Sequence, residues 1–145
     1  MHVFCVFHDP AVLYTVMQIW PNTNIQAHNF ISTDYWQSNF DVVKEMLPHA
    51  EIYVHEDDCS KQIDGFIGLN GNYIEGVFVK EAAQSKGIGK QLLDHAKKVK
   101  STLRLSVYQQ NKKAIQFYLR EEFCIQSENI DNNTGENEFV MVWNR

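Results

Sequence analysis

A glycine-containing loop is the first feature of this chain that could carry chemistry. The segment QSKGIGK, residues 84–90, follows an apolar β-prone stretch and leads into an amphipathic stretch with Ile88 and Leu92 on one side. Free N–H groups at such a strand-to-helix turn bind phosphate. The loop matches neither G-x-x-x-x-G-K-[ST] nor G-x-G-x-x-G, the patterns of nucleotide and dinucleotide sites. It therefore predicts a site for another phosphate compound, with a purely structural turn as the alternative.

Histidine and cysteine spacing predicts no metal site. The six histidines form no H-E-x-x-H pattern, and Cys5, Cys59 and Cys124 form no C-x-x-C pair. The cysteines are interpreted as small core residues of a protein from a reducing compartment. The first ten residues, MHVFCVFHDP, show no positive leader and no apolar run long enough to span a membrane, so a cytoplasmic protein is expected.

Charge is distributed unevenly along the chain. The net charge is −5, but residues 80–120 hold 10 of the 13 basic residues and only two of the 18 acidic ones. Overall acidity argues against a nucleic-acid partner. The contrast favours a polyanion bound by the basic segment and a cation drawn to the remainder, with lysine-rich solvated helix faces as the alternative.

The elements that must position these residues are predicted from apolar periodicity and capping residues. Helices are expected at 10–20 (ending before Pro21), 33–47, 88–99 and 112–122. Strands are expected at 2–7, 50–57, 63–69, 73–79, 103–108, 123–130 and 137–143. The strands between 50 and 79 suit an antiparallel meander with a hairpin at Asn70-Gly71. This order of elements favours an α+β domain.

Two motifs in this order resemble those of the GNAT superfamily of acyl-CoA N-acyltransferases. QSKGIG at 84–89 is similar to its phosphate loop, Q/R-x-x-G-x-G/A, and NKKAIQFY at 111–118 is similar to its N-x-x-A-x-x-F-Y block. AHNFISTDYW at 27–36 further resembles small bacterial single-domain members. The chain departs from the pattern at Glu81, where many members have proline, and at Glu122, where many have glycine.

The resemblance covers nearly the whole chain and implies a fold and a co-substrate. The implied fold is a single domain over 1–145, a three-layer α/β/α arrangement with a mixed, mostly antiparallel sheet, a splayed central strand pair and about four helices. Acetyl-CoA is the implied co-substrate, its pyrophosphate held by the glycine loop and its pantetheine by the main chain of the strand at 73–79. Glycines at 87 and 89 would let N–H groups approach the pyrophosphate without interference from a Cβ. The residues expected to contact acetyl-CoA are Val77, Phe78, Val79, Gln84, Ser85, Lys86, Gly87, Ile88, Gly89, Lys90, Asn111, Ala114 and Tyr118.

Three side chains are candidates for catalysis. Tyr118 stands where the family commonly places a tyrosine near the departing sulfur; packing on the helix face is the alternative. Glu75 is a candidate general base, directly or through water, or else a solvated carboxylate. Tyr73 would position the acceptor or relay a proton, or pack in the core. With regular alternation Glu75 points the same way as Tyr73 and Val77, unless a β-bulge at Gly76 changes the parity.

The implied function is transfer of an acetyl group from acetyl-CoA to a primary amine by direct attack in a ternary complex. The acceptor would be a protein lysine, a protein N-terminus or a small molecule, and His28 is expected to line its pocket by analogy with the family. A non-catalytic acyl-CoA-binding sensor is the alternative. A nucleotide-binding regulatory domain is disfavoured, because no Walker lysine or magnesium-binding acid follows the loop. A homodimer is common among similar proteins, and the sequence leaves the oligomeric state open.

Overall fold

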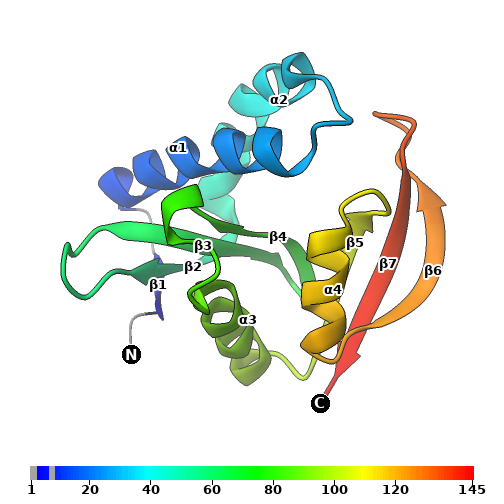
Figure 1. Cartoon of the computed structure of the whole chain (residues 1–145). Coiled ribbons are helices and arrows are strands. Elements are labelled where there is room, and N and C mark those ends of the chain that lie inside the picture. Colours follow the sequence, from blue (N-terminus) through cyan, green and yellow to red (C-terminus); the bar gives the residue numbers. More distant parts are fainter. Residues whose placement is uncertain (1–2, 7–8) are drawn as a thin grey trace.

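The computed structural model describes residues 3–6 and 9–145, in which a seven-stranded sheet lies between two pairs of helices (Figure 1). The strands are β1 Val3–Val6, β2 Glu51–Glu56, β3 Ile63–Asn70, β4 Tyr73–Val79, β5 Thr102–Tyr108, β6 Cys124–Ile130 and β7 Asn137–Asn144. The helices are α1 Pro10–Ala27, α2 Thr33–Met46, α3 Ile88–Val99 and α4 Lys112–Arg120, with 3₁₀ turns η1 Leu47–His49 and η2 Glu81–Ala83. The predicted fold class is confirmed. Of the first expected strand, 2–7, residues 2 and 7 lie outside the described part.

The sheet is mixed and mostly antiparallel, in the order β1-β2-β3-β4-β5-β7-β6. Strands β1 to β4 pair antiparallel, so the expected meander is confirmed, and β6 and β7 form a hairpin at one edge. Strand β4 pairs with β5 in parallel, while β5 pairs antiparallel with β7. The single parallel pair joins the two halves of the sheet.

Helix α1 does not end before Pro21, as the sequence analysis expected, but continues to Ala27. A proline inside a helix removes one backbone hydrogen bond and costs about 3 kcal/mol. Side chains around it supply other bonds, because the Thr23 hydroxyl donates to the carbonyl of Ile19 at 2.8 Å and the Asn24 amide donates to that of Trp20 at 3.0 Å. Burial of Ile19 and Trp20 under this helix adds further compensation. The prediction was wrong because packing outweighed the local break.

Two apolar cores lie on opposite faces of the sheet. One joins α1 and α2 to the sheet through residues such as Trp20, Trp36, Ile52, Val54 and Phe66. The other joins α3 and α4 to the opposite face and contains Ile67, Ile74, Leu92, Leu93, Leu105, Tyr118 and Phe123. Membership of these cores shows to which face each strand residue points.

Two of the cysteines are exposed, contrary to expectation. Cys59 lies in the turn after β2, and Cys124 lies on β6, a strand at the edge of the sheet. The prediction of core cysteines was therefore wrong for both; the side chain of Cys5 lies outside the described part. Among residues 3–6 and 9–145, no helix is long and apolar enough to cross a membrane.

Candidate functional site

The central strands β4 and β5 separate soon after they pair. Their parallel register comprises Tyr73 with Arg104 and Ile74 with Leu105. Beyond these residues β4 remains paired with β3 as far as Val79, and β5 remains paired with β7 as far as Tyr108. Figure 1 shows the two strands diverging toward the ends that lead into α3 and α4. The main chain of β4 after Ile74 therefore has no β5 partner.

A β-bulge at Glu75 begins this divergence. Leu69 pairs with Ile74 and Gly68 pairs with Gly76, which leaves Glu75 as an extra residue. The expected bulge beside Gly76 is confirmed, and a Cβ on Gly76 would overlap the Phe78 ring, which stacks on Phe66 with 4.7 Å between ring centroids. Glycine at this position thus lets Phe78 fold back over its own strand.

The bulge changes the alternation of side chains along β4. Ile74 and Val77 both point into the core beneath α3. Glu75 points to the opposite face, where its Cβ would lie 3.8 Å from a Cβ on Gly68. Tyr73 lies on that face too, with the Arg104 guanidinium 5.5 Å above its ring. Glu75 therefore shares a face with Tyr73, as regular alternation predicts, but not with Val77, which lies after the bulge.

The glycine loop ends at the N-terminus of α3. The Gln84 side chain donates to the carbonyl of Val79 at 2.9 Å and holds the loop against the end of β4. Gly87 caps α3 with a φ of 83° and no side-chain hydrogen bond. Within the described part of the chain, the N–H groups of Ile88, Gly89 and Lys90 meet no acceptor. Such free N–H groups, with the positive end of the helix dipole, form a site for an anion.

The two loop glycines differ in what they contribute. At Gly87 no atom lies within 4 Å of an added Cβ, but its left-handed backbone strains any other residue. At Gly89 an added Cβ would lie 3.5 Å from the Phe117 ring, an ordinary contact on the inner side of the helix. The expectation that both glycines keep a Cβ away from the phosphate therefore does not match the direction of Gly89.

The two lysines of the loop also differ. Lys86 is exposed, with its side chain available to an anion. Lys90 is bonded to Asp94 at 3.2 Å and to Glu121 at 3.1 Å, and these carboxylates raise the pKa of its ammonium, Glu121 most. Lys90 thus links α3 to the end of α4, and Lys86 is the freer cation of the two.

Helix α4 presents Tyr118 to the core between α3, α4 and the sheet. Asn111 caps the helix, its side chain accepting from the N–H of Ala114 at 3.3 Å. The Tyr118 ring is 7% exposed and packs on Phe117 and Phe123. Within the described residues its hydroxyl finds no hydrogen-bond partner. Burial raises the pKa of this hydroxyl well above its ordinary value, and the nearby Tyr73 adds a smaller increase. The hydroxyl therefore stays protonated and can donate a hydrogen bond.

An aromatic cluster lies on the α1 and α2 side of the sheet, beside the end of β5. His28 stacks on Trp36 with 5.1 Å between centroids and meets Tyr108 edge-on at 5.2 Å. The Tyr108 hydroxyl donates to Asp131 of the β6–β7 turn at 2.6 Å. Burial and this carboxylate raise the pKa of Tyr108. The sequence analysis named His28 but missed Tyr108 and Asp131. The position of Tyr108 at the end of a predicted strand was a signal that could have indicated it.

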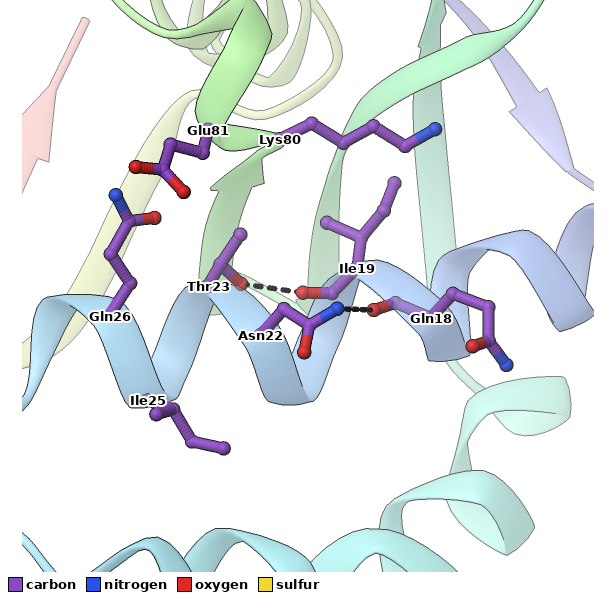
Figure 2. A pocket seen from close by; sticks show the side chains of 8 residues that line it. All are labelled: Gln18, Ile19, Asn22, Thr23, Ile25, Gln26, Lys80 and Glu81. Carbon is purple, nitrogen blue, oxygen red and sulfur yellow. Dashed lines mark hydrogen bonds between the residues drawn. The ribbon is translucent and has the colours of Figure 1, made fainter.

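A cavity of about 470 Å³ lies between α1 and the end of β4 (Figure 2). Three amide side chains one helical turn apart, Gln18, Asn22 and Gln26, lie along it, opposite Lys80 and Glu81. It adjoins the glycine loop, because Gln26 lies 3.5 Å from Gln84. The cavity contains none of the candidate catalytic side chains, so it flanks the strand divergence rather than forming it.

The structure brings most of the predicted site residues to one region. The end of β4, the loop at 84–90, Asn111 and Tyr118 all border the divergence of β4 and β5, and His28 reaches it from α1 through a 3.3 Å contact with Asn111. Ile88 and Ala114 offer main-chain groups only, since Ile88 is buried in the core and Ala114 packs against it. Among residues 3–6 and 9–145, no group of three His, Cys, Asp or Glu side chains could hold a metal ion.

Several known proteins are similar to this chain. It is 29% identical over 133 residues to the peptidyl-lysine N-acetyltransferase YiaC of Escherichia coli K12, covering 90% of each chain. It is 29% identical over 110 residues to the peptidyl-lysine N-acetyltransferase YjaB of Salmonella typhimurium, covering 76% of this chain and 75% of the relative.

Solved structures share the fold over the whole chain. The apo form of YjaB from Escherichia coli has a TM-score of 0.84 at 23% identity, covering 99% of this chain and 98% of that one. The PaiA N-acetyltransferase of Thermoplasma acidophilum, solved with coenzyme A, has a TM-score of 0.80 at 21% identity and covers all of both chains. The family model described as an acetyltransferase (GNAT) domain matches residues 48–125. This match includes the bulged strand, the glycine loop, Asn111 and Tyr118, and the chain belongs to the GNAT acetyltransferase family.

Proposed function

We propose that this acyltransferase transfers the acetyl group of acetyl-CoA to a lysine side chain of a protein or peptide, by direct attack in a ternary complex. The observation that carries the proposal is the alignment of three features along one opening. These are the unpaired main chain after the bulge in β4, the free N–H groups of α3 and the unbonded hydroxyl of Tyr118. We further propose that residues 1–145 act as one cytoplasmic acetyltransferase domain.

The hydrogen-bonding groups along the opening between β4 and β5 suit the pyrophosphate and the pantetheine of acetyl-CoA. A pyrophosphate needs hydrogen-bond donors and positive charge, which the N–H groups of residues 85–90 and the exposed Lys86 supply. An extended pantetheine needs main-chain partners, which Val77 and Val79 offer on the side of β4 that faces away from β3, with Asn111 and Ala114 at the start of α4. The main chain of Phe78 points to β3 instead, because Lys80 and then every second residue of β4 bonds to that strand, so Phe78 is not proposed as a main-chain partner. Solved relatives support this assignment, since PaiA was crystallised with coenzyme A and YncA of Salmonella typhimurium with acetyl-CoA.

Acetyl-CoA supplies an activated thioester, and the residues of this chain orient it and move protons. A backbone N–H near Val77, freed from β5 by the bulge, is placed to bind the thioester oxygen as its charge grows. The Tyr118 hydroxyl, protonated because of its burial, donates to the departing sulfur. Both interactions strengthen as the reaction proceeds, so both lower the barrier.

The attacking amine must lose a proton before it reacts. A lysine ammonium with a pKa near 10.4 costs about 4.6 kcal/mol to deprotonate at pH 7. Glu75 is exposed on the face that it shares with Tyr73, and we propose that it takes this proton, directly or through water. Tyr73 and His28 would line the path of the amine on the same side of the sheet.

Two observations favour a peptidyl-lysine as the acceptor. YiaC and YjaB are both peptidyl-lysine N-acetyltransferases. In addition, carboxylates of the β6–β7 hairpin, among them Asp131 and Glu138, lie beside the aromatic cluster, where partial burial and then the negative charge of Asp131 raise the pKa of Glu138. A desolvated negative region bordered by aromatic rings attracts a cationic side chain.

The proposal is tested by presenting acetyl-CoA with three acceptors. These are a lysine peptide with a blocked N-terminus, a lysine-free peptide with a free N-terminus, and a polyamine. Released CoA should be separated by chromatography, because the exposed Cys59 and Cys124 would react with thiol dyes. The blocked lysine peptide should give the fastest release. Preference for either other amine would refute the acceptor, and acetyl-CoA binding without release in any mixture would favour the sensor function.

A further inference from the structure

Two hydrogen-bonding side chains link the C-terminus of α1 to the N-terminus of α4. His28 caps α1, and both its backbone N–H and its Nδ1 lie within bonding distance of the Asn24 carbonyl, at 3.0 and 2.9 Å. Its Nε2 lies 3.3 Å from Nδ2 of Asn111. Asn111 in turn accepts the N–H of Ala114 at 3.3 Å. This His28–Asn111 bridge connects helices on opposite faces of the sheet, at the end of β5.

The bonds of the bridge determine where its protons lie. Because Oδ1 of Asn111 accepts from Ala114, its Nδ2 faces His28, and an amide nitrogen can only donate. The Nε2 atom of His28 must therefore carry a lone pair. The Nδ1 atom then carries the proton and donates it to the Asn24 carbonyl, which can only accept. The bridge requires neutral His28 in this one tautomer.

The surroundings of His28 support the neutral form. Its ring lies between Trp36, Phe30 and Tyr108, and burial lowers the pKa of the imidazole although the Asn24 carbonyl partly opposes this. The titratable groups nearby are Tyr108 on β5, Tyr35 on α2 and Asp131 on the β6–β7 turn. The Asp131 carboxylate is bonded to the Tyr108 hydroxyl, and within the described part no carboxylate bonds to His28.

A second proton on His28 is incompatible with the cap of α4. It would place an N–H of the imidazolium against the NH₂ group of Asn111. Rotating the Asn111 amide would offer its oxygen to His28 but would turn the NH₂ group toward the N–H of Ala114, so the helix would lose its cap. Protonation of His28 and capping of α4 therefore exclude each other.

We propose that His28 is a positioning residue for acetyl transfer, whose neutral form holds Asn111 and thereby the helix that carries Tyr118. This inference rests on the proposed function only in its effect on rate; the coupling between His28 and Asn111 stands apart from it. The ligand that changes the state of this bridge is a proton, which binds to Nε2 of His28. Turnover should fall as His28 gains its second proton, because α4 and Tyr118 are then less well placed.

The coupling is tested by NMR titration of the whole chain without co-substrate. Imidazole ¹⁵N shifts should show the Nδ1–H tautomer and a His28 pKa below 6.5, and the amide signal of Ala114 should move with that titration. Asn111→Asp keeps a good capping group but faces Nε2 with a carboxylate, so it should raise the His28 pKa above that of the wild type. An Nε2–H tautomer, or an Ala114 signal indifferent to His28, would overturn the bridge.

The effect on rate is tested with two substitutions of His28. His28→Gln can accept from Asn111 but does not titrate, so its kcat should exceed that of His28→Leu and should lose the acidic decline. His28→Leu has no acceptor, and kcat of the folded protein should fall roughly 2- to 30-fold, the range that loss of an N-cap supports. Equal kcat and identical pH profiles in all variants would overturn the positioning role. Absence of turnover in the wild type would instead refute the proposed function and leave the NMR result to decide the coupling.

Discussion

Replacing Tyr118 with phenylalanine separates a catalytic hydroxyl from a packing ring. The ring lies in the core with Phe117 and Phe123, while the hydroxyl bonds to no described residue. Tyr118→Phe keeps the ring and removes only the group assigned to the departing sulfur. Because no protein hydrogen bond is lost, the free energy of unfolding should change by less than about 0.5 kcal/mol.

The expected effect on kcat follows from proton affinities. A thiol with a pKa near 8.5 and a tyrosine near 10 make full proton transfer uphill by about 2 kcal/mol, and burial of Tyr118 raises its pKa and increases that cost. Tyr118 therefore acts mainly through a hydrogen bond to the thiolate. A hydrogen bond to a charged group contributes about 1.5–3 kcal/mol, so kcat should fall roughly 10- to 150-fold.

The assay is steady-state CoA release at saturating acetyl-CoA, with acetyl-CoA affinity measured by calorimetry. Tyr53→Phe is the matched control, because Tyr53 is buried in the same core but its hydroxyl bonds to Glu51. That control should lose about 0.5–1.5 kcal/mol of stability and keep kcat. If Tyr118→Phe turned over within threefold of the wild type, the assignment of the hydroxyl would be refuted.

Three further predictions concern the loop, the base and pH. Gly87→Ala should weaken acetyl-CoA binding in calorimetry and lose about 1–2 kcal/mol of stability, because its φ is 83°, whereas Gly89→Ala should bind nearly normally. Glu75→Gln should shift the pH profile of kcat without changing acetyl-CoA affinity, and an unchanged profile would leave Glu75 as a solvated carboxylate. Burial lowers the pKa of His28 and His95, so the native state binds fewer protons than the unfolded chain. The free energy of unfolding measured in urea should therefore be highest above about pH 6.5. It should fall as the pH drops through the lowered pKa values of these histidines in the native state, and a free energy independent of pH would contradict this.

Local patterns in the sequence predicted most of the fold. Capping residues and apolar periodicity located all four helices, and Asn70-Gly71 located the hairpin between β3 and β4. The end of α1 was missed, because the cost of Pro21 is local whereas the burial that offsets it comes from the sheet. Helix α4 ends before Glu122, which adopts a φ of 72° where a glycine would be unstrained.

The candidate site was predictable where it depends on one segment. The bulge at Gly76 and the cap at Asn111 each follow from a single residue type in its element. The face to which Val77 points departs from regular alternation, because the extra residue in β4 inverts the alternation for the residues that follow the bulge. The contact between His28 and Asn111 joins residues 83 positions apart, and only the packing of both layers on the sheet brings them together.

The central claim is that an acetyl group passes directly from acetyl-CoA to an amine held by this chain. The most direct measurement is a single turnover with acetyl-CoA labelled in its acetyl group, quenched before and after a blocked lysine peptide is added. Direct transfer predicts no label on the protein before the peptide is added, and afterwards equal amounts of labelled peptide and free CoA. Label on the protein before the peptide arrives, or acetyl-CoA that stays intact with the peptide present, would contradict it.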